Sequence, residues 1–136
     1  PITHLAIFLP FLETVWRTDA TRTSLAWIPY NAAIWMRTID TRTNEPVTET
    51  IFYPHPHPGI IHALTIHDSG AIDEGTASAD GEAIRIDAER ADDAATTRIE
   101  QRIERLGAEG LRLQTWSFND AGRNRIADTT HRAAGD

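Results

Sequence analysis

Most of the chain from residue 31 to residue 131 alternates between apolar and polar positions. Successive side chains of a β-strand point to opposite faces of a sheet, so this alternation predicts strands. Short turn sequences rich in Gly, Pro, Asn and Asp separate the alternating runs, as in antiparallel hairpins. The predicted strands cover residues 31–39, 47–53, 60–67, 71–78, 82–89, 97–106, 111–118 and 123–131.

Strands of this length, each joined to the next by a short turn, predict a mainly β fold. We expect a single antiparallel up-and-down β-barrel of about eight or nine strands. A further strand is expected within 22–28. A chain of 136 residues forms one domain, here spanning 1–136. A small closed barrel encloses a lumen, and that lumen is the natural place for a ligand.

The segment 3–16 differs from the rest of the chain and predicts a short helix. Its apolar residues recur at three- and four-residue spacing, at Leu5, Phe8 or Leu9, Leu12 and Trp16. Pro10 weakens the middle of a helix unless the helix is short. A short helix before the first strand would plug one end of the barrel.

The segment 92–106 fits two structures. An acidic residue at 92 or 93 could cap a helix, with Ile99, Ile103 and Leu106 at helical spacing. The alternative is a strand that pairs with residues 111–118 as a hairpin. We expect the strand, because Ile99 and Ile103 alternate with charged residues.

Composition excludes several classes of function. The net charge of −7 argues against a nucleic-acid partner, because phosphate contacts need clustered positive charge. There is no Cys, which removes disulfides and thiolate catalysis and is consistent with a cytoplasmic protein. No apolar run reaches the roughly 20 residues of a membrane-spanning helix, so no membrane span is expected.

Strand 60–67 has two mainly apolar faces, and the choice between them decides which histidine is internal. One face carries Ile60, His62, Leu64 and Ile66, and the other carries Ile61, Ala63, Thr65 and His67. If the first face is interior, His62 lies in the lumen, where it is the candidate general base or ligand-orienting group. His67 begins a turn and is expected to be exposed.

Aromatic and polar residues on the strands supply the candidate binding residues. The lumen is expected to bind its ligand through Trp35, Arg37, Tyr53, His62, Leu64 and Trp116. Tryptophans also simply fill cores, and this alternative stays open for all four. The acidic pair Asp73 and Glu74 is expected on a solvated face.

The segment from Tyr53 to Gly59 alternates proline with histidine. His55 and His57 could bind a metal through neutral imidazoles. Alternating prolines also favour a stiff, extended surface connector, and we favour this interpretation over a metal site.

The layout as a whole resembles the calycin group, which includes lipocalins, fatty-acid-binding proteins and nitrobindin-like haem barrels. The resemblance covers most of the chain and rests on an N-terminal helix that ends Val15-Trp16 and a meander that ends Thr130-His131-Arg132. It implies a lumen that binds a small molecule. In the nitrobindin-like members this is haem, for which His131 would be the candidate axial ligand. The glycine-rich motif that surrounds the first tryptophan of those proteins is absent around Trp16.

The leading hypothesis is therefore that the barrel binds a small, largely apolar ligand and carries no cofactor. One alternative is an enzyme, an isomerase, cyclase or hydrolase, with a lumen histidine as general base. Another is a haem-binding barrel. A filled barrel with a purely structural role and association into a homodimer also stay open.

Overall fold

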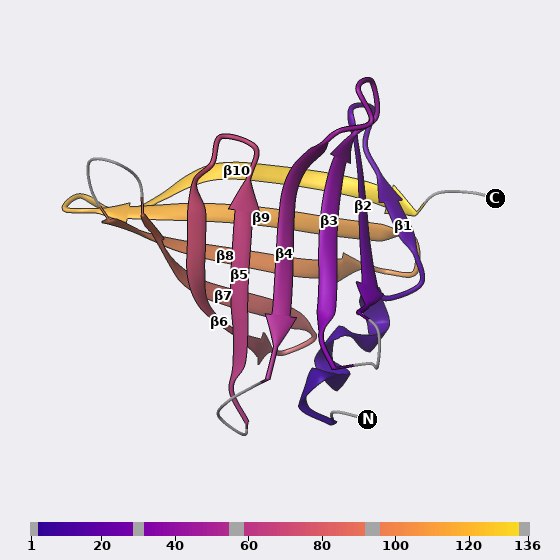
Figure 1. The fold of residues 1–136 in the computed structure, drawn as a ribbon, viewed down its shortest axis with the longest axis horizontal. Helices are drawn as coiled ribbons and strands as arrows, with labels where there is room; N and C mark the ends of the chain where they lie inside the picture. Colours follow the sequence, from indigo (N-terminus) through magenta and orange to yellow (C-terminus); the bar gives the residue numbers. More distant parts are fainter. Residues whose placement is uncertain (1–2, 29–31, 55–58, 92–95, 134–136) are drawn as a thin grey trace.

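The computed structural model describes residues 3–28, 32–54, 59–91 and 96–133. These residues form one 3-10 helix, η1 (Thr3–Phe11), and ten β-strands (Figure 1). The strands are β1 (Val15–Arg17), β2 (Thr21–Trp27), β3 (Ile34–Asp40), β4 (Pro46–Tyr53), β5 (Ile61–His67), β6 (Ile72–Asp80), β7 (Ala83–Ala91), β8 (Thr96–Leu106), β9 (Gly110–Asn119) and β10 (Gly122–Ala133).

Each strand pairs antiparallel with the next one in sequence, and β1 pairs with β10 to close the barrel. The predicted mainly β, up-and-down antiparallel barrel is therefore confirmed. It has ten strands rather than eight or nine, because residues 15–27 form two strands where one was expected. In Figure 1, β2–β5 stand upright in front and β7–β10 run across behind them.

The segment with two possible structures is a strand. β8 pairs with β7 on one side and with β9 on the other, as in the pairs Ile99↔Ala88 and Ile99↔Ser117. Ile99 and Ile103 are buried. Two partner strands and a regular inward face outweigh the helical spacing of these isoleucines. Residues 92–95, which include the proposed helix cap, lie outside the described residues.

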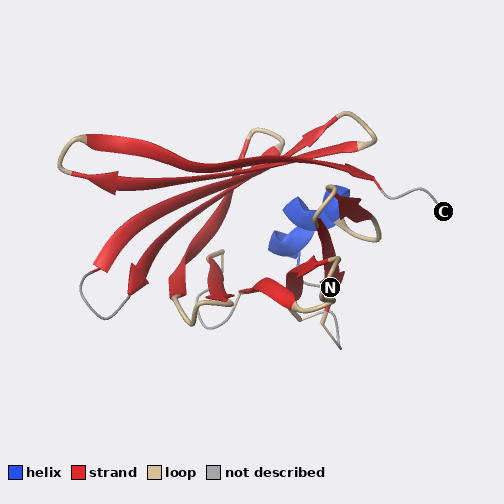
Figure 2. Ribbon diagram, turned by 90° about the horizontal axis from the view of Figure 1, so that it is seen from above, coloured by secondary structure: helices blue, strands red, loops and turns tan. Residues whose placement is uncertain are grey.

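Helix η1 lies between the two layers of strands at one end of the barrel (Figure 2). A 3-10 helix has 3.0 residues per turn, so residues three apart share one face. Leu5, Phe8 and Phe11 are three apart, and all are fully buried. Phe8 packs on Phe52 of β4, with ring centroids 4.5 Å apart. Trp16, expected at the end of the helix, is instead a buried residue of β1.

Two strands approach unusually closely beside the lumen. A Cβ placed on Gly75 of β6 would lie 1.8 Å from the backbone oxygen of Asp87 and 2.5 Å from the Cα of Ala88 on β7. Gly75 therefore allows an approach that a side chain would block. Two positions before Gly75, the residue pair Asp73↔Arg90 faces the interior.

The barrel closes through a short seam. β1 meets β10 at only two residue pairs, Trp16↔Ala133 and Arg17↔Arg132. From residue 122 to residue 131, β10 pairs with β9 alone among the described strands. The wall is therefore incomplete on the side of β10 that faces the turn between β1 and β2.

Candidate functional site

The lumen holds a cavity of about 490 Å³. Its lining includes the ends of β2–β5 that lie opposite η1, together with β7–β10 (Figure 1). Thr18, Ala20 and Ile126 lie along its rim beside the incomplete part of the wall. Ile126 is 52% exposed and occupies a break in the register between β10 and β9. The barrel is thus filled by side chains at one end and hollow at the other.

Threonine is the commonest residue of the cavity wall. The wall threonines are Thr18, Thr21, Thr38, Thr48, Thr50, Thr65, Thr115 and Thr129. The hydroxyl oxygens of Thr50 and Thr65 are 2.7 Å apart across β4 and β5. Hydroxyls that bond one another do not need a ligand or a water as partner, so an apolar ligand can cover them without a large desolvation cost.

Three charged or titratable side chains form a cluster on the interior face of the barrel, near the ends of β5, β6 and β7. Asp73 is 3% exposed and accepts hydrogen bonds at both carboxylate oxygens. Arg90 donates from Nε to Oδ1 at 2.7 Å and from Nη2 to Oδ2 at 3.0 Å. His67 Nε2 lies 2.8 Å from Asp73 Oδ2. His67 and Arg90 line the cavity, and Asp73 supports them from behind.

The electrostatics of this cluster favour an ionised carboxylate. Burial works to raise the pKa of Asp73, but hydrogen bonds from His67 and Arg90 outweigh burial and hold the pKa below its ordinary value. A bidentate pair between arginine and a carboxylate is strong and fixes the geometry of both groups. The cluster is therefore a rigid support for the His67 ring.

His131 lies on β10 at the other side of the cavity. It is 2% exposed, and burial lowers its pKa below the ordinary value, while the backbone of Thr129 acts in the opposite direction. Its Nε2 lies 3.4 Å from the hydroxyl of Thr23 on β2. That contact joins β10 to β2 next to the short seam. Its Nδ1 is buried without a hydrogen-bond partner among the described residues.

His131 does not fit the role of an axial haem ligand in this geometry. A haem iron needs an imidazole nitrogen that opens onto the cavity. Nδ1 of His131 is enclosed, and Nε2 is directed to Thr23. The walls that a porphyrin would cover carry many threonines. The residues present therefore do not fit a haem, and no step of the function is derived through one.

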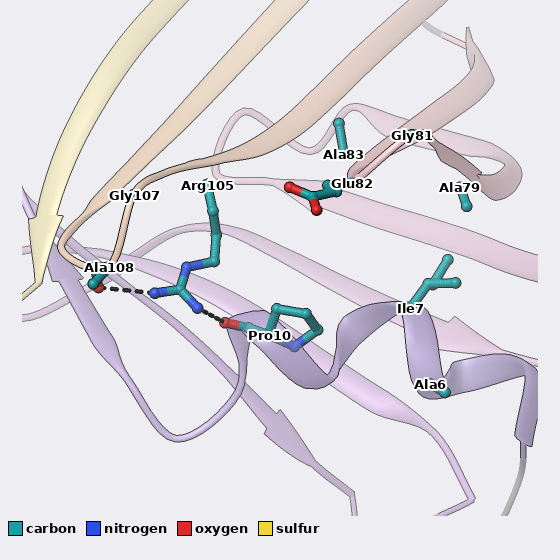
Figure 3. Close-up of a pocket in the computed structure, with 10 residues that line it drawn as sticks. All are labelled: Ala6, Ile7, Pro10, Ala79, Gly81, Glu82, Ala83, Arg105, Gly107 and Ala108. Atoms are coloured by element: carbon teal, nitrogen blue, oxygen red, sulfur yellow. Dashed lines mark hydrogen bonds between the residues drawn. The ribbon is translucent and has the colours of Figure 1, made fainter.

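A second hollow, of about 520 Å³, lies outside the barrel between η1 and the turns that follow β6 and β8 (Figure 3). Arg105 crosses it and donates hydrogen bonds to the carbonyl oxygens of Pro10 at 3.0 Å and Ala108 at 2.8 Å. The guanidinium is thereby used to attach the end of η1 to the barrel. The other lining side chains are mainly small, apart from Ile7 and Glu82. We therefore regard this hollow as structural and place the candidate site in the lumen.

The side chains predicted to line the lumen lie on the outer face of the barrel. They are Trp35, Arg37, Tyr53, His62, Leu64 and Trp116, and none of them lines the cavity. Their strand neighbours Ile34, Phe52 and Ala63 take the buried positions. The expectation that these side chains face inward is therefore corrected.

These outward side chains make contacts along the wall. The Arg37 guanidinium lies 5.2 Å from the Trp35 ring centroid and pairs with Glu49 at 2.8 Å. The rings of Tyr53 and His62 are stacked, with centroids 5.2 Å apart. The reason for the error is pairing: His62 lies between Tyr53 and the exposed Thr76, on the outer face. Alternation along β5 alone did not distinguish its two apolar faces.

The sequence analysis missed the three residues of the inner cluster. His67 was expected to be exposed and Asp73 to be solvated, and both expectations are wrong. A signal was present. The alternation that puts Ile84 and Ile86 inside also puts Arg90 inside, four positions beyond Ile86 on the same strand. Polar residues near strand ends were interpreted as turn residues when they continue the inner face.

The metal hypothesis for the His-Pro segment stays a prediction. His55 and His57 lie outside the described residues. Within the part of the chain that the structure describes, no group of three or more His, Asp or Glu side chains is arranged to hold a metal ion.

The comparisons with known proteins give no relative for this chain. No protein-family model and no curated protein sequence matches it. In the described ranges, the chain has no helix with the length and hydropathy needed to cross a lipid bilayer.

Proposed function

We propose that this chain binds a small, largely apolar molecule in the lumen of the barrel. The observation that carries the proposal is the cavity of about 490 Å³ at one end of a barrel whose other end is filled. Met36, Ile103 and Leu113 give it apolar wall, and burial of apolar ligand surface contributes roughly 25 cal/mol per Å². The calycin-like layout supports the same proposal, since calycins use their lumen in this way.

The amino-acid composition bears on the class of partner and on the cellular location of the protein. The net charge of −7 disfavours nucleic acid as the occupant. The lack of cysteine supports a cytoplasmic location.

A titration with 2-methoxynaphthalene, a flat apolar probe, tests the proposal. We expect saturable binding in the lumen that Thr115→Trp abolishes, because Thr115 lines the cavity and a larger ring would occupy it. Thr76→Trp is the matched control, since Thr76 is exposed on the outer face of β6 and should leave binding unchanged. Equal binding to both folded variants, or no binding to the wild type, would contradict the proposal.

The second candidate function is an enzyme with a lumen histidine as general base. One observation favours it: His67 Nε2 is 2.8 Å from a buried carboxylate that Arg90 holds in place. A carboxylate behind an imidazole orients the ring and stabilises its protonated form. The candidate base is then His67 rather than His62. A bell-shaped or sigmoidal pH profile that His67→Gln removes and His62→Gln preserves would support this function.

A further inference from the structure

The position of the proton on the His67 ring can be worked out from its neighbours. Nε2 lies 2.8 Å from Asp73 Oδ2 and 3.1 Å from Arg90 Nη2. An ionised carboxylate can only accept hydrogen bonds, and a guanidinium can only donate them. Nε2 therefore either carries the proton and donates to Asp73, or lacks it and accepts from Arg90.

The contact with Asp73 is the stronger of the two. It is the shorter, at 2.8 Å against 3.1 Å, and both contacts pair the ring with a charged group. Arg90 Nη2 already donates to the same carboxylate at 3.0 Å. The proton of the neutral ring is therefore on Nε2, and the lone pair is on Nδ1. The hydrogen bond that Nε2 makes to Asp73 therefore sets the tautomer of the ring.

Nδ1 is then the hydrogen-bond acceptor of a ring that lines the cavity. His67 lines the cavity, and its Nδ1 has no hydrogen bond with any described residue. Some polar groups of the wall already bond one another, as in the hydroxyl pairs Thr50–Thr65 and Thr18–Thr21. The side chain of His67 is 17% exposed, so part of it remains accessible.

We propose that the ligand of this cavity is an apolar molecule that carries a hydroxyl or N–H group and donates a hydrogen bond from it to Nδ1 of His67. The inference rests on the proposed binding function and specifies its ligand class. A carboxylate or ether oxygen at the same place would meet a lone pair and gain nothing. Asp73 acts as a positioning residue, because it sets the ring and its tautomer without lining the cavity, and Arg90 holds the Asp73 carboxylate in place.

The test compares 2-naphthol with 2-methoxynaphthalene, which differ in the donor hydrogen. We expect the wild type to bind 2-naphthol about tenfold more tightly, the effect of one net hydrogen bond. His67→Phe should remove this preference and keep the affinity for 2-methoxynaphthalene. His62→Phe is the matched control on the outer face of the same strand and should keep the preference.

The outcomes separate the two proposals. If neither probe binds, the binding function fails and the ligand class fails with it. If both probes bind the wild type equally, binding stands and the ligand class is overturned. Nitrogen-15 NMR of the free wild type gives an independent check should His67→Phe not fold: protonation at Nε2 supports the inference, and protonation at Nδ1 overturns it.

Discussion

Asp73 shows how much a single buried charge can determine in this protein. It is 3% exposed and is bonded by both Arg90 and His67. Removing one member of a buried ion pair leaves the others desolvated without compensation. Asp73 therefore contributes both to stability and to the orientation of the His67 ring.

Asp73→Asn is expected to lower the free energy of unfolding at pH 7 by about 3 kcal/mol, at the lower end for buried pairs because Arg90 is 24% exposed. The folded-state pKa of Asp73 is depressed, so its contribution is complete above the unfolded pKa and is lost as pH falls through the folded pKa. The difference between wild type and variant should therefore begin to shrink below about pH 4 and should close only as pH falls through the lowered folded-state pKa. Urea denaturation at pH 7 and at lower pH measures this. Asp120→Asn, at an exposed turn, should change little, and a difference that persists in acid would contradict the assignment.

At the scale of elements, the approach of β6 to β7 places the inner cluster. Gly75 has no side chain to separate the strands, and the pair Asp73↔Arg90 lies two residues along. Helix η1 fills the other end with Leu5, Phe8 and Phe11. The hollow end of the barrel is thus defined by one close strand pair and one plug.

The substitution Gly75→Ala tests whether a steric clash in the folded state outweighs the lower conformational entropy of the unfolded chain. Replacing glycine by alanine in an ordinary backbone conformation stabilises a protein by about 0.4–1 kcal/mol through the unfolded state. Here the new Cβ would lie 1.8 Å from the Asp87 oxygen, so we expect destabilisation by about 2 kcal/mol instead. Chemical denaturation checks the sign. Ser78→Ala, at an exposed position of the same strand, is the control, and a stabilised Gly75→Ala variant would refute the close approach.

At the scale of the whole molecule, the outer surface has one charged face and one face with exposed apolar side chains. The outer face of β7–β10 carries a network of ion pairs, such as Arg85 and Arg123 with Glu100. The outer face of β3–β6 carries exposed apolar side chains, with Trp35, Ile51, Ile66 and Ile72 between 36% and 46% exposed. Adjacent exposed apolar side chains of this kind often mark an interface.

The homodimer that the sequence leaves open would use this apolar face. Arg37 and Glu49 pair with each other on this face, so two copies could bring its apolar side chains together without leaving either of these charges unpaired. The face is smaller than the roughly 20–30 residues per side of a standard interface, which predicts a weak dimer. Light scattering over a concentration series should show association that Ile66→Glu removes. Leu9→Glu, exposed on η1, should retain it, and a wild type that stays monomeric throughout would refute the homodimer.

The fold could be predicted because it depends on local patterns. Alternation along each strand and the turn residues between strands specify antiparallel hairpins one after another. Ile84 and Ile86, opposed by Arg85 and Asp87, needed no knowledge of their neighbours to be placed. The extra strand was missed because Val15–Arg17 is too short for its alternation to be recognised.

The site could not be predicted, because pairing between strands decides which face of β5 points inward and therefore which histidine lines the lumen. His62 and His67 lie on opposite faces of β5, and both faces are mainly apolar in sequence. The register with Phe52 and Gly75 places Ala63 inside, and His67 then follows by the same parity. Local alternation thus determines that a barrel forms, whereas contacts between distant strands decide which histidine faces its lumen.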